Sequence, residues 1–204
     1  MKLYASQGSP FARKIRVMLI EKNAPHEVEM VDLWAGANDL KKTNPLGKVP
    51  ALRLDDERAL VNSPLIADYV DARFPEPRFI PADPDRRLEV RRWEALADGT
   101  MDAAVASFYE MRFHDERKRS RVWLERQRGK LDSGFAALER MLGDRAWCVG
   151  DAMTLADIAL ACHIGFISAR RAEFFPQETY PGLAQLWKRL EARESFKRTV
   201  PPPA

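Results

Sequence analysis

The sequence predicts an α/β unit followed by an all-α unit in a chain of 204 residues. Short strand-like and helical segments alternate from residue 1 to residue 76, as they do in α/β folds. Four prolines then fall between residues 75 and 85, a spacing typical of a linker. From residue 86 to residue 204 the apolar residues recur with helical spacing. We therefore place the linker at residues 77–85.

The first unit is expected to have the element order β-α-β-α-β-β-α. Strands are predicted at residues 2–6, 27–33, 49–54 and 58–61, and helices at residues 10–22, 37–43 and 64–74. The first helix would present one apolar face, formed by Phe11, Ile15, Met18 and Leu19. Because short connections join the first strand, helix and strand, the two strands should pair in parallel through a right-handed crossover. The last two strands should form a hairpin.

The second unit is expected to be a set of long helices. The first would carry one face formed by Leu88, Arg92, Leu96 and Gly99, with Trp93 alongside. The next would bury Leu124, Leu131, Phe135, Leu138 and Leu142. A third helix begins near Leu155, where Thr154 and Asp157 have the spacing of a capping box. A fourth is expected at residues 182–193.

Composition excludes several classes of function. The chain has a net charge of +3, and most of its basic residues are interspersed with acidic ones. The densest basic run, residues 116–121, lacks the interleaved aromatic residues of a nucleic-acid stacking surface and is expected to join two helices. No apolar run approaches the roughly 18 residues that a membrane helix needs, and no signal peptide is visible. We expect no nucleic-acid partner, no membrane partner and a cytoplasmic location.

Cysteine and histidine spacing argues against a metal site or a disulfide framework. The chain has two cysteines, Cys148 and Cys162, far apart in the sequence, and Cys162 falls on an apolar helical stripe typical of the core. The three histidines lack metal-ligand spacing, and His163 adjoins the same stripe. We expect no bound metal.

Two Ser-Pro pairs stand where helices begin, at Ser9-Pro10 and at Ser63-Pro64. Serine at the N-cap accepts a hydrogen bond from a free backbone N–H, and proline suits the first turn. The free N–H groups and partial positive charge of a helix N-terminus also favour anions. Capping and anion binding are therefore two compatible interpretations of each pair.

Four motifs occur in one order along the chain: "SPFARK" at residues 9–14, "NPLGKVPAL" at 44–52, "NSPLIADYV" at 62–70 and "TLADI" at 154–158. In this order and spacing the chain resembles a cytosolic-type glutathione S-transferase of a bacterial, serine-type kind. The resemblance runs nearly end to end. It implies a thioredoxin-like first domain, a helical second domain and a homodimer in which the third helix of one subunit meets the first long helix of the other.

The resemblance also implies a site for glutathione as co-substrate. Ser9 would stand where the family presents a hydroxyl or thiol to the glutathione sulfur, followed by Phe11. The Val49-Pro50 bond would be cis, and its backbone groups would pair with the cysteinyl part of glutathione. Asn62 and Ser63 would hold the γ-glutamyl end. The family has an acidic residue at the position of Asn62, so this sequence departs from the pattern by lacking that charge. Lys48 could meet a carboxylate or be an ordinary solvated lysine.

The expected reaction is attack of the glutathione thiolate on an electrophilic small molecule, with Ser9 donating to the sulfur. Four residues at helical spacing would wall the electrophile pocket or belong to the core: Met101, Val105, Phe108 and Arg112. Two alternatives stay open. One is a glutathione-dependent isomerase, dehalogenase or peroxidase on the same site. The other is a non-catalytic relative that binds protein, since fold does not fix function.

Overall fold

The protein, examined as a computed structural model, is described for residues 1–35 and 39–202. Within those ranges four strands form one sheet in the order β2-β1-β3-β4. Their bounds are Lys2–Ala5 for β1, Glu27–Met30 for β2, Ala51–Arg53 for β3 and Ala59–Val61 for β4. β1 pairs in parallel with β2 and antiparallel with β3, and β3 and β4 form the hairpin. The predicted order of elements and the pairing are confirmed.

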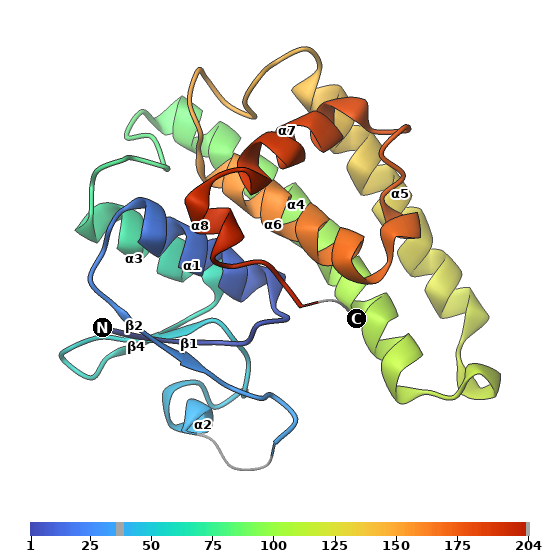
Figure 1. The fold of residues 1–204 in the computed structure, drawn as a ribbon, viewed down its shortest axis with the longest axis horizontal. Coiled ribbons are helices and arrows are strands. Elements are labelled where there is room, and N and C mark those ends of the chain that lie inside the picture. Colours follow the sequence, from blue (N-terminus) through green and yellow to red (C-terminus); the bar gives the residue numbers. More distant parts are fainter. Residues whose placement is uncertain (36–38, 203–204) are drawn as a thin grey trace.

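Helices cover both faces of this sheet. Figure 1 shows α1 (Pro10–Glu21) and α3 (Ser63–Arg73) on one face and α2 (Leu40–Thr43) on the other. Because side chains alternate along a strand, Leu3 and Ala5 join the main core while Tyr4 packs beneath the sheet with Val31, Leu40 and Ala51. The thioredoxin-like arrangement expected for the first unit is therefore present. Of the predicted helix at residues 37–43, Ala37 and Asn38 lie outside the described residues.

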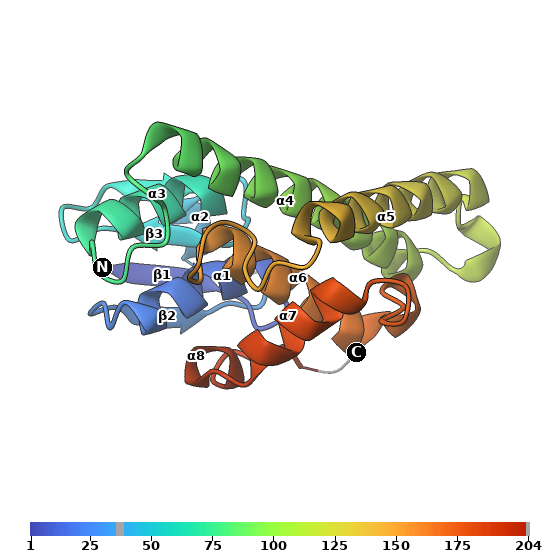
Figure 2. The same cartoon turned by 90° about the horizontal axis from the view of Figure 1, so that it is seen from above.

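The second unit is helical throughout, as predicted. Its elements are α4 (Pro84–Phe113), η1 (Glu116–Lys118), α5 (Arg121–Leu142), α6 (Leu155–Arg170), η2 (Ala172–Phe174), α7 (Pro181–Glu191) and α8 (Glu194–Lys197). Figure 2 shows α4 and α5 as a long hairpin, with α6 and α7 lying against it. α6 is buried from Leu155 to Ile167 and contacts α1, which joins the two units. Cys162 and His163 lie inside this core, as expected.

The buried face of α4 differs from the predicted one. Leu88 is 58% exposed, and Arg92 and Gly99 are exposed as well. The face toward the core carries Val90, Trp93, Ala97 and Met101 instead. This face packs against α5 and α6. The approach of α5 is close, because a Cβ built on Gly134 would lie 2.1 Å from the hydroxyl oxygen of Thr100 on α4.

The capping box predicted at the start of α6 is confirmed. Thr154 is the N-cap residue, and its backbone N–H donates to the Asp157 carboxylate at 2.8 Å. The other oxygen of this carboxylate accepts from the Cys148 N–H, also at 2.8 Å. Asp157 thus fixes the preceding loop as well as the helix.

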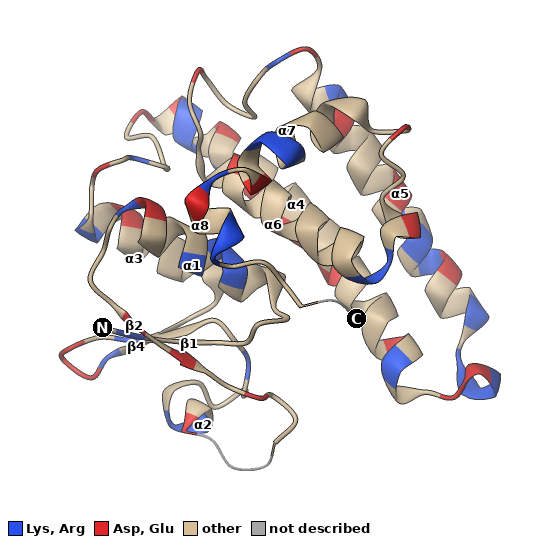
Figure 3. Cartoon of the chain, viewed as in Figure 1, with Lys and Arg blue, Asp and Glu red and all other residues tan. Residues whose placement is uncertain are grey.

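Charged residues of both signs are intermixed over the surface, including the α4–α5 connection at residues 116–121 (Figure 3). Within the described part of the chain, no helix combines the length and apolar character needed to cross a membrane.

Candidate functional site

Three of the predicted site segments meet at one end of the sheet. In the register, Tyr4 is opposite Ala51, and Ala51 is opposite Val61. Pro50 and Asn62, which flank Ala51 and Val61 in the chain, therefore lie beside each other. They adjoin the end of β1, from which the chain enters the turn that carries Ser9. These segments are far apart along the sequence, and the pairing of the strands brings them together.

Ser9 caps α1 and keeps a hydrogen to donate. Its backbone is extended, with φ −87° and ψ 119°, and its hydroxyl oxygen accepts from the Ala12 N–H at 3.2 Å. The hydroxyl is half-buried, and the first turn of α1 contains no acidic residue. The positive end of the helix is thus not neutralised from within its own first turn. An oxygen that accepts from a backbone N–H is also a better donor through its own hydrogen.

Phe11 lies on the other side of this turn. Its ring meets the His163 ring edge-on, with centroids 5.4 Å apart. The predicted site residue Phe11 therefore anchors the start of α1 against α6.

The Val49-Pro50 bond is cis, as the resemblance implied. The loop before it is held by Asn44, a buried residue that sequence reasoning missed. The Asn44 side-chain amide donates to the Lys48 carbonyl at 2.7 Å, and its oxygen accepts from the Leu46 N–H at 3.1 Å. The signal that could have found it is its place before Pro45, since Asn commonly bonds nearby backbone in turns. Asn44 thus positions the segment that leads into Val49.

At the second Ser-Pro pair the cap is Asn62, which corrects the expectation that Ser63 would be the cap. Ser63 is the first helical residue, is buried, and is followed by Pro64. Asn62 has φ 76° and ψ 129°, and its side chain makes no capping hydrogen bond. Positive φ is uncommon for residues other than glycine, although Asn tolerates it better than most. Because the first turn of α3 also lacks an acidic residue, its N-terminus is a second candidate anion site.

Lys48 is exposed, but it is not isolated from the second unit. Burial and the neighbouring Asp98 raise the pKa of Asp102 on α4, and the positive charge of Lys48 opposes that rise. The loop that carries Lys48 is therefore near a carboxylate of the second unit.

A buried cluster of charges lies behind the Ser9 turn. The Lys14 ammonium is 2.7 Å from Glu94 and 2.9 Å from Asp98, and the His163 Nε2 atom is 3.3 Å from Asp98. Burial, with Lys14 adding to it, lowers the pKa of His163 to about 3. Burial raises the pKa of Asp98. The cluster ties α1 to α4 and α6, and nothing in the local sequence pattern indicated it.

The predicted pocket wall on α4 divides between core and surface. Met101 is fully buried in the core, Val105 and Phe108 are half-buried, and Arg112 is exposed. The structure places three other aromatic residues together on the surface: Trp34 is 56% exposed, Tyr109 39% and Phe113 51%. The Trp34 ring centroid is 5.7 Å from that of Tyr109 and 4.6 Å from that of Phe113. Sequence analysis missed them because Tyr109 and Phe113 follow the predicted stripe by one position and Trp34 lies in a loop.

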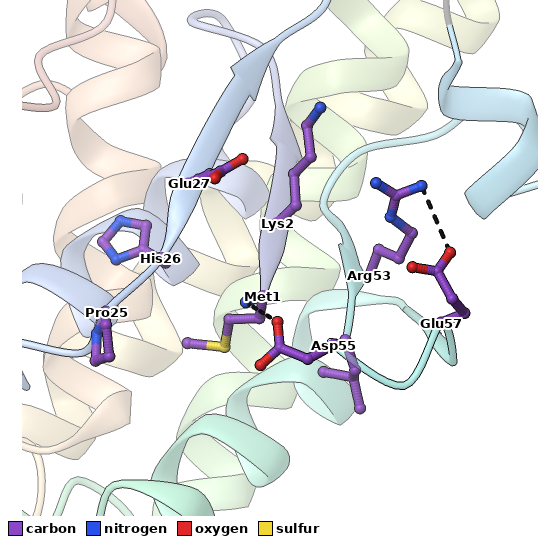
Figure 4. A pocket seen from close by; sticks show the side chains of 9 residues that line it. Met1, Lys2, Pro25, His26, Glu27, Arg53, Asp55 and Glu57 are labelled. Atoms are coloured by element: carbon purple, nitrogen blue, oxygen red, sulfur yellow. Dashed lines mark hydrogen bonds and ion pairs between the residues drawn. The ribbon is translucent and has the colours of Figure 1, made fainter.

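A surface pocket of about 480 Å³ lies at the opposite end of β1 from the Ser9 turn, lined by residues that include Met1, His26 and Asp55. Figure 4 shows the Met1 amino group directed at Asp55, 2.6 Å from its carboxylate, and Arg53 directed at Glu57. Two pairs of its charged groups thus neutralise each other, and the predicted site residues are not among its lining residues. In the described ranges no group of three or more His, Cys, Asp or Glu residues is arranged to hold a metal ion.

Two family models match the chain: glutathione S-transferase, N-terminal domain, at residues 3–78, and glutathione S-transferase, C-terminal domain, at residues 121–186. An uncharacterized GST-like protein of Escherichia coli strain K12, YibF, is 38% identical over 204 residues, which span 100% of both chains. A maleylacetoacetate isomerase of Pseudomonas aeruginosa is 32% identical over 169 residues, or 78% of each chain.

Among solved structures, a glutathione S-transferase of Methylobacillus flagellatus with glutathione bound superposes with a TM-score of 0.93. It is 38% identical, and the match covers 100% of this chain and 99% of that one.

Proposed function

This chain belongs to the glutathione S-transferase family, and from that membership we propose that it binds glutathione and ionises its thiol for attack on a small electrophile. The observation that carries the proposal is the Ser9 hydroxyl at the N-terminus of α1, which accepts from the Ala12 N–H and donates its own hydrogen to none of the described residues. The Methylobacillus structure, alike over its whole length, supports glutathione as the ligand.

The three converging segments suit three different groups of glutathione: its thiol, the backbone of its cysteinyl part and its γ-glutamyl end. Among the described residues, the backbone N–H and C=O of Val49 form no hydrogen bond, so they are available to the cysteinyl part. Such groups are rarely left without a partner when a ligand covers them. The N-terminus of α3 at Asn62 and Ser63 would take the γ-glutamyl carboxylate. Lys48 would add a positive charge beside them.

Ser9 would act by stabilising the sulfur anion. A free thiol has a pKa near 8.5, so only a few per cent is ionised at neutral pH. The Ser9 O–H donates to the thiolate, the α1 terminus adds its field, and the thiol proton passes to solvent. A sulfur lone pair then forms a C–S bond. In a substitution, the leaving group departs with the electron pair of its own bond to that carbon.

The substitution Ser9→Ala tests this role. A charge-assisted hydrogen bond is worth about 1.5–3 kcal/mol, so the pKa of bound glutathione should rise by about one to two units. At neutral pH the rate of thiolate attack should fall about ten- to a hundredfold. Ultraviolet thiolate absorbance of the bound tripeptide, titrated against pH, measures ionisation without turnover.

Ser120→Ala is the matched control. Ser120 caps α5 with the same geometry, because its hydroxyl accepts from the Trp123 N–H at 3.2 Å, but it lies far along the chain from the site. The Ser120→Ala variant should lose about 0.5–2 kcal/mol of unfolding free energy, because a helix cap is removed, and its glutathione thiolate titration should be unchanged. If the Ser9→Ala protein folds and its titration overlays the parent's, Ser9 is only a cap.

The relative from Pseudomonas aeruginosa favours a second candidate, a glutathione-dependent isomerase. The same thiolate would add to a carbon of a conjugated double bond and push an electron pair into the adjacent carbonyl. After rotation about the resulting single bond, the electron pair moves back from the carbonyl, the carbon–carbon double bond forms again, and the C–S bond breaks to release the thiolate. Because this reaction regenerates glutathione, following free thiol during turnover distinguishes isomerisation from transfer.

A further inference from the structure

We propose that Arg170, the last residue of α6, binds an anionic group of the second substrate, so that the electrophile is a carboxylate or similar anion on a flat conjugated framework. The inference rests on the proposed function, because it concerns the molecule that the thiolate attacks. Three observations support the inference: the guanidinium lies beside the Ser9 turn, it has no ionic partner among the described residues, and it adjoins a group of aromatic rings.

The guanidinium lies against the turn that carries Ser9. A Cβ built on Gly8 would be 3.0 Å from the Arg170 Nη2 atom. Glycine at this position therefore lets the guanidinium approach the backbone one residue before Ser9. A ligand held by Arg170 would consequently lie beside the sulfur that Ser9 is proposed to activate.

Arg170 has no counter-charge. Its Nη1 atom is buried and forms no hydrogen bond to any described residue, and no carboxylate of those residues pairs with it. Burial lowers its pKa, without an acidic neighbour to oppose the effect. The adjacent Arg171, by contrast, lies 2.6 Å from Glu173. Arg170 is half-buried, and a partly desolvated guanidinium without an anion is unfavourable, so its place beside the turn favours binding of an anionic ligand.

Two rings hold the guanidinium in place. Its central carbon lies 4.5 Å from the Phe166 ring centroid and 6.0 Å from that of Phe108. Stacking of this kind stabilises the cation through its face. The N–H groups around the edge donate to none of the described residues, and their planar arrangement suits a carboxylate.

An aromatic surface continues from this pair of rings. Phe108 lies 6.0 Å from Phe166 and 6.0 Å from Tyr109, measured between ring centroids. Tyr109 in turn meets Trp34 and Phe113. Phe166 is buried and Phe108 half-buried, whereas Trp34, Tyr109 and Phe113 are exposed, and exposed rings in contact with one another are typical of a binding surface. A flat conjugated ligand would stack on these rings, and its anionic end would reach Arg170.

The test compares glutathione conjugates that carry no thiol, so that binding does not depend on ionisation. S-(3-carboxybenzyl)- and S-(4-carboxybenzyl)glutathione are matched with their methylbenzyl counterparts, and dissociation constants are measured by titration calorimetry. We expect at least one carboxylate conjugate to bind about tenfold more tightly than its methyl counterpart. In Arg170→Met this preference should disappear, while the affinity for glutathione itself should change less than twofold.

Two further variants complete the test. Arg171→Met, one position along, should keep the preference, and Arg170→Lys should retain part of it because it keeps the charge without the planar fork. Equal affinity for carboxylate and methyl conjugates in the parent, or no binding of any conjugate, would overturn the proposal. So would a loss of glutathione affinity in Arg170→Met, because the anion would then be glutathione's own carboxylate. Failure of the proposed function is seen separately, in the thiolate titration of the parent and of Ser9→Ala.

Discussion

The ammonium group of Lys14 lies 2.7 Å from a carboxylate oxygen of Glu94, with 0% and 3% of the two side chains exposed. Lys14 is in α1, the helix that Ser9 caps, and Glu94 is in α4. Glu94 also pairs with Arg91, which in turn pairs with Asp68 of α3. A chain of ion pairs therefore fixes the candidate site's helix against the second unit.

Removing Lys14 should destabilise the protein strongly. Lys14→Met leaves the carboxylates of Glu94 and Asp98 buried with one cation fewer, and breaking a buried ion pair typically costs about 3–5 kcal/mol. Adding Glu94→Leu should recover part of this loss, since the unpaired charge is removed. Urea unfolding of the parent, both single variants and the double variant measures the coupling free energy. Strict additivity of the two single effects would show that the pair does not interact energetically.

His163 should make stability depend on pH. In the unfolded chain it protonates near its ordinary pKa of 6.5, whereas in the folded protein the pKa is about 3. Between these values the unfolded state binds the extra proton, so stability falls as pH decreases, by about 1.4 kcal/mol per unit. Asp98, whose pKa is raised in the folded protein, acts in the opposite direction above its ordinary pKa.

The substitution His163→Gln isolates the contribution of the histidine, because Asp98 is present in both proteins. The free energy of unfolding, measured at pH 6.5 and pH 5.0, should differ less in the variant than in the parent. Equal slopes in the His163→Gln protein and the parent would mean that His163 takes up its proton in the fold as it does in the unfolded chain, so that burial does not lower its pKa.

Asn62→Asp should strengthen glutathione binding modestly. It adds a carboxylate where the family pattern has one, opposite the proposed site of the ligand ammonium, and keeps a residue type that tolerates positive φ. A partly exposed pair is worth roughly 0–1 kcal/mol, or up to about fivefold in affinity by calorimetry. Asn62→Gly is the control, because it keeps the backbone and removes the side chain. A tenfold loss in Asn62→Asp would mean that the asparagine serves another ligand.

The protein should form a homodimer through α3 and α4. Leu65 and Leu88 are 50% and 58% exposed on these two helices. The helices are linked beside them by the Asp68–Arg87 ion pair, 2.5 Å long. Light scattering should give twice the 23.3 kDa chain mass, and Leu88→Arg should shift the protein toward monomer. Val122→Arg, at another exposed apolar position on α5, should not. A parent of 23.3 kDa at micromolar concentration would contradict this prediction.

What the sequence determined by itself was mostly local. The order of strands and helices, the Ser9 cap and the Thr154–Asp157 capping box each depend on residues within a few positions of one another. Periodicity and capping rules describe interactions over that range. The cis Val49-Pro50 bond also followed from sequence, through the family resemblance and not through the general preference of X-Pro bonds.

Only the tertiary structure decided which faces and charges meet. On α4 the face containing Val90, Trp93 and Ala97 is buried in place of the predicted one, and it packs against α5 and α6. Lys14 donates to Glu94, which is 80 positions away in the sequence. Arg170, at the C-terminal end of α6, lies close to Gly8. A helical stripe specifies which side chains share a face but not what that face packs against. The surroundings of Lys14 and Arg170 are fixed by how α4 and α6 pack around α1 and the Gly8–Ser9 turn, and that packing is a property of the whole chain.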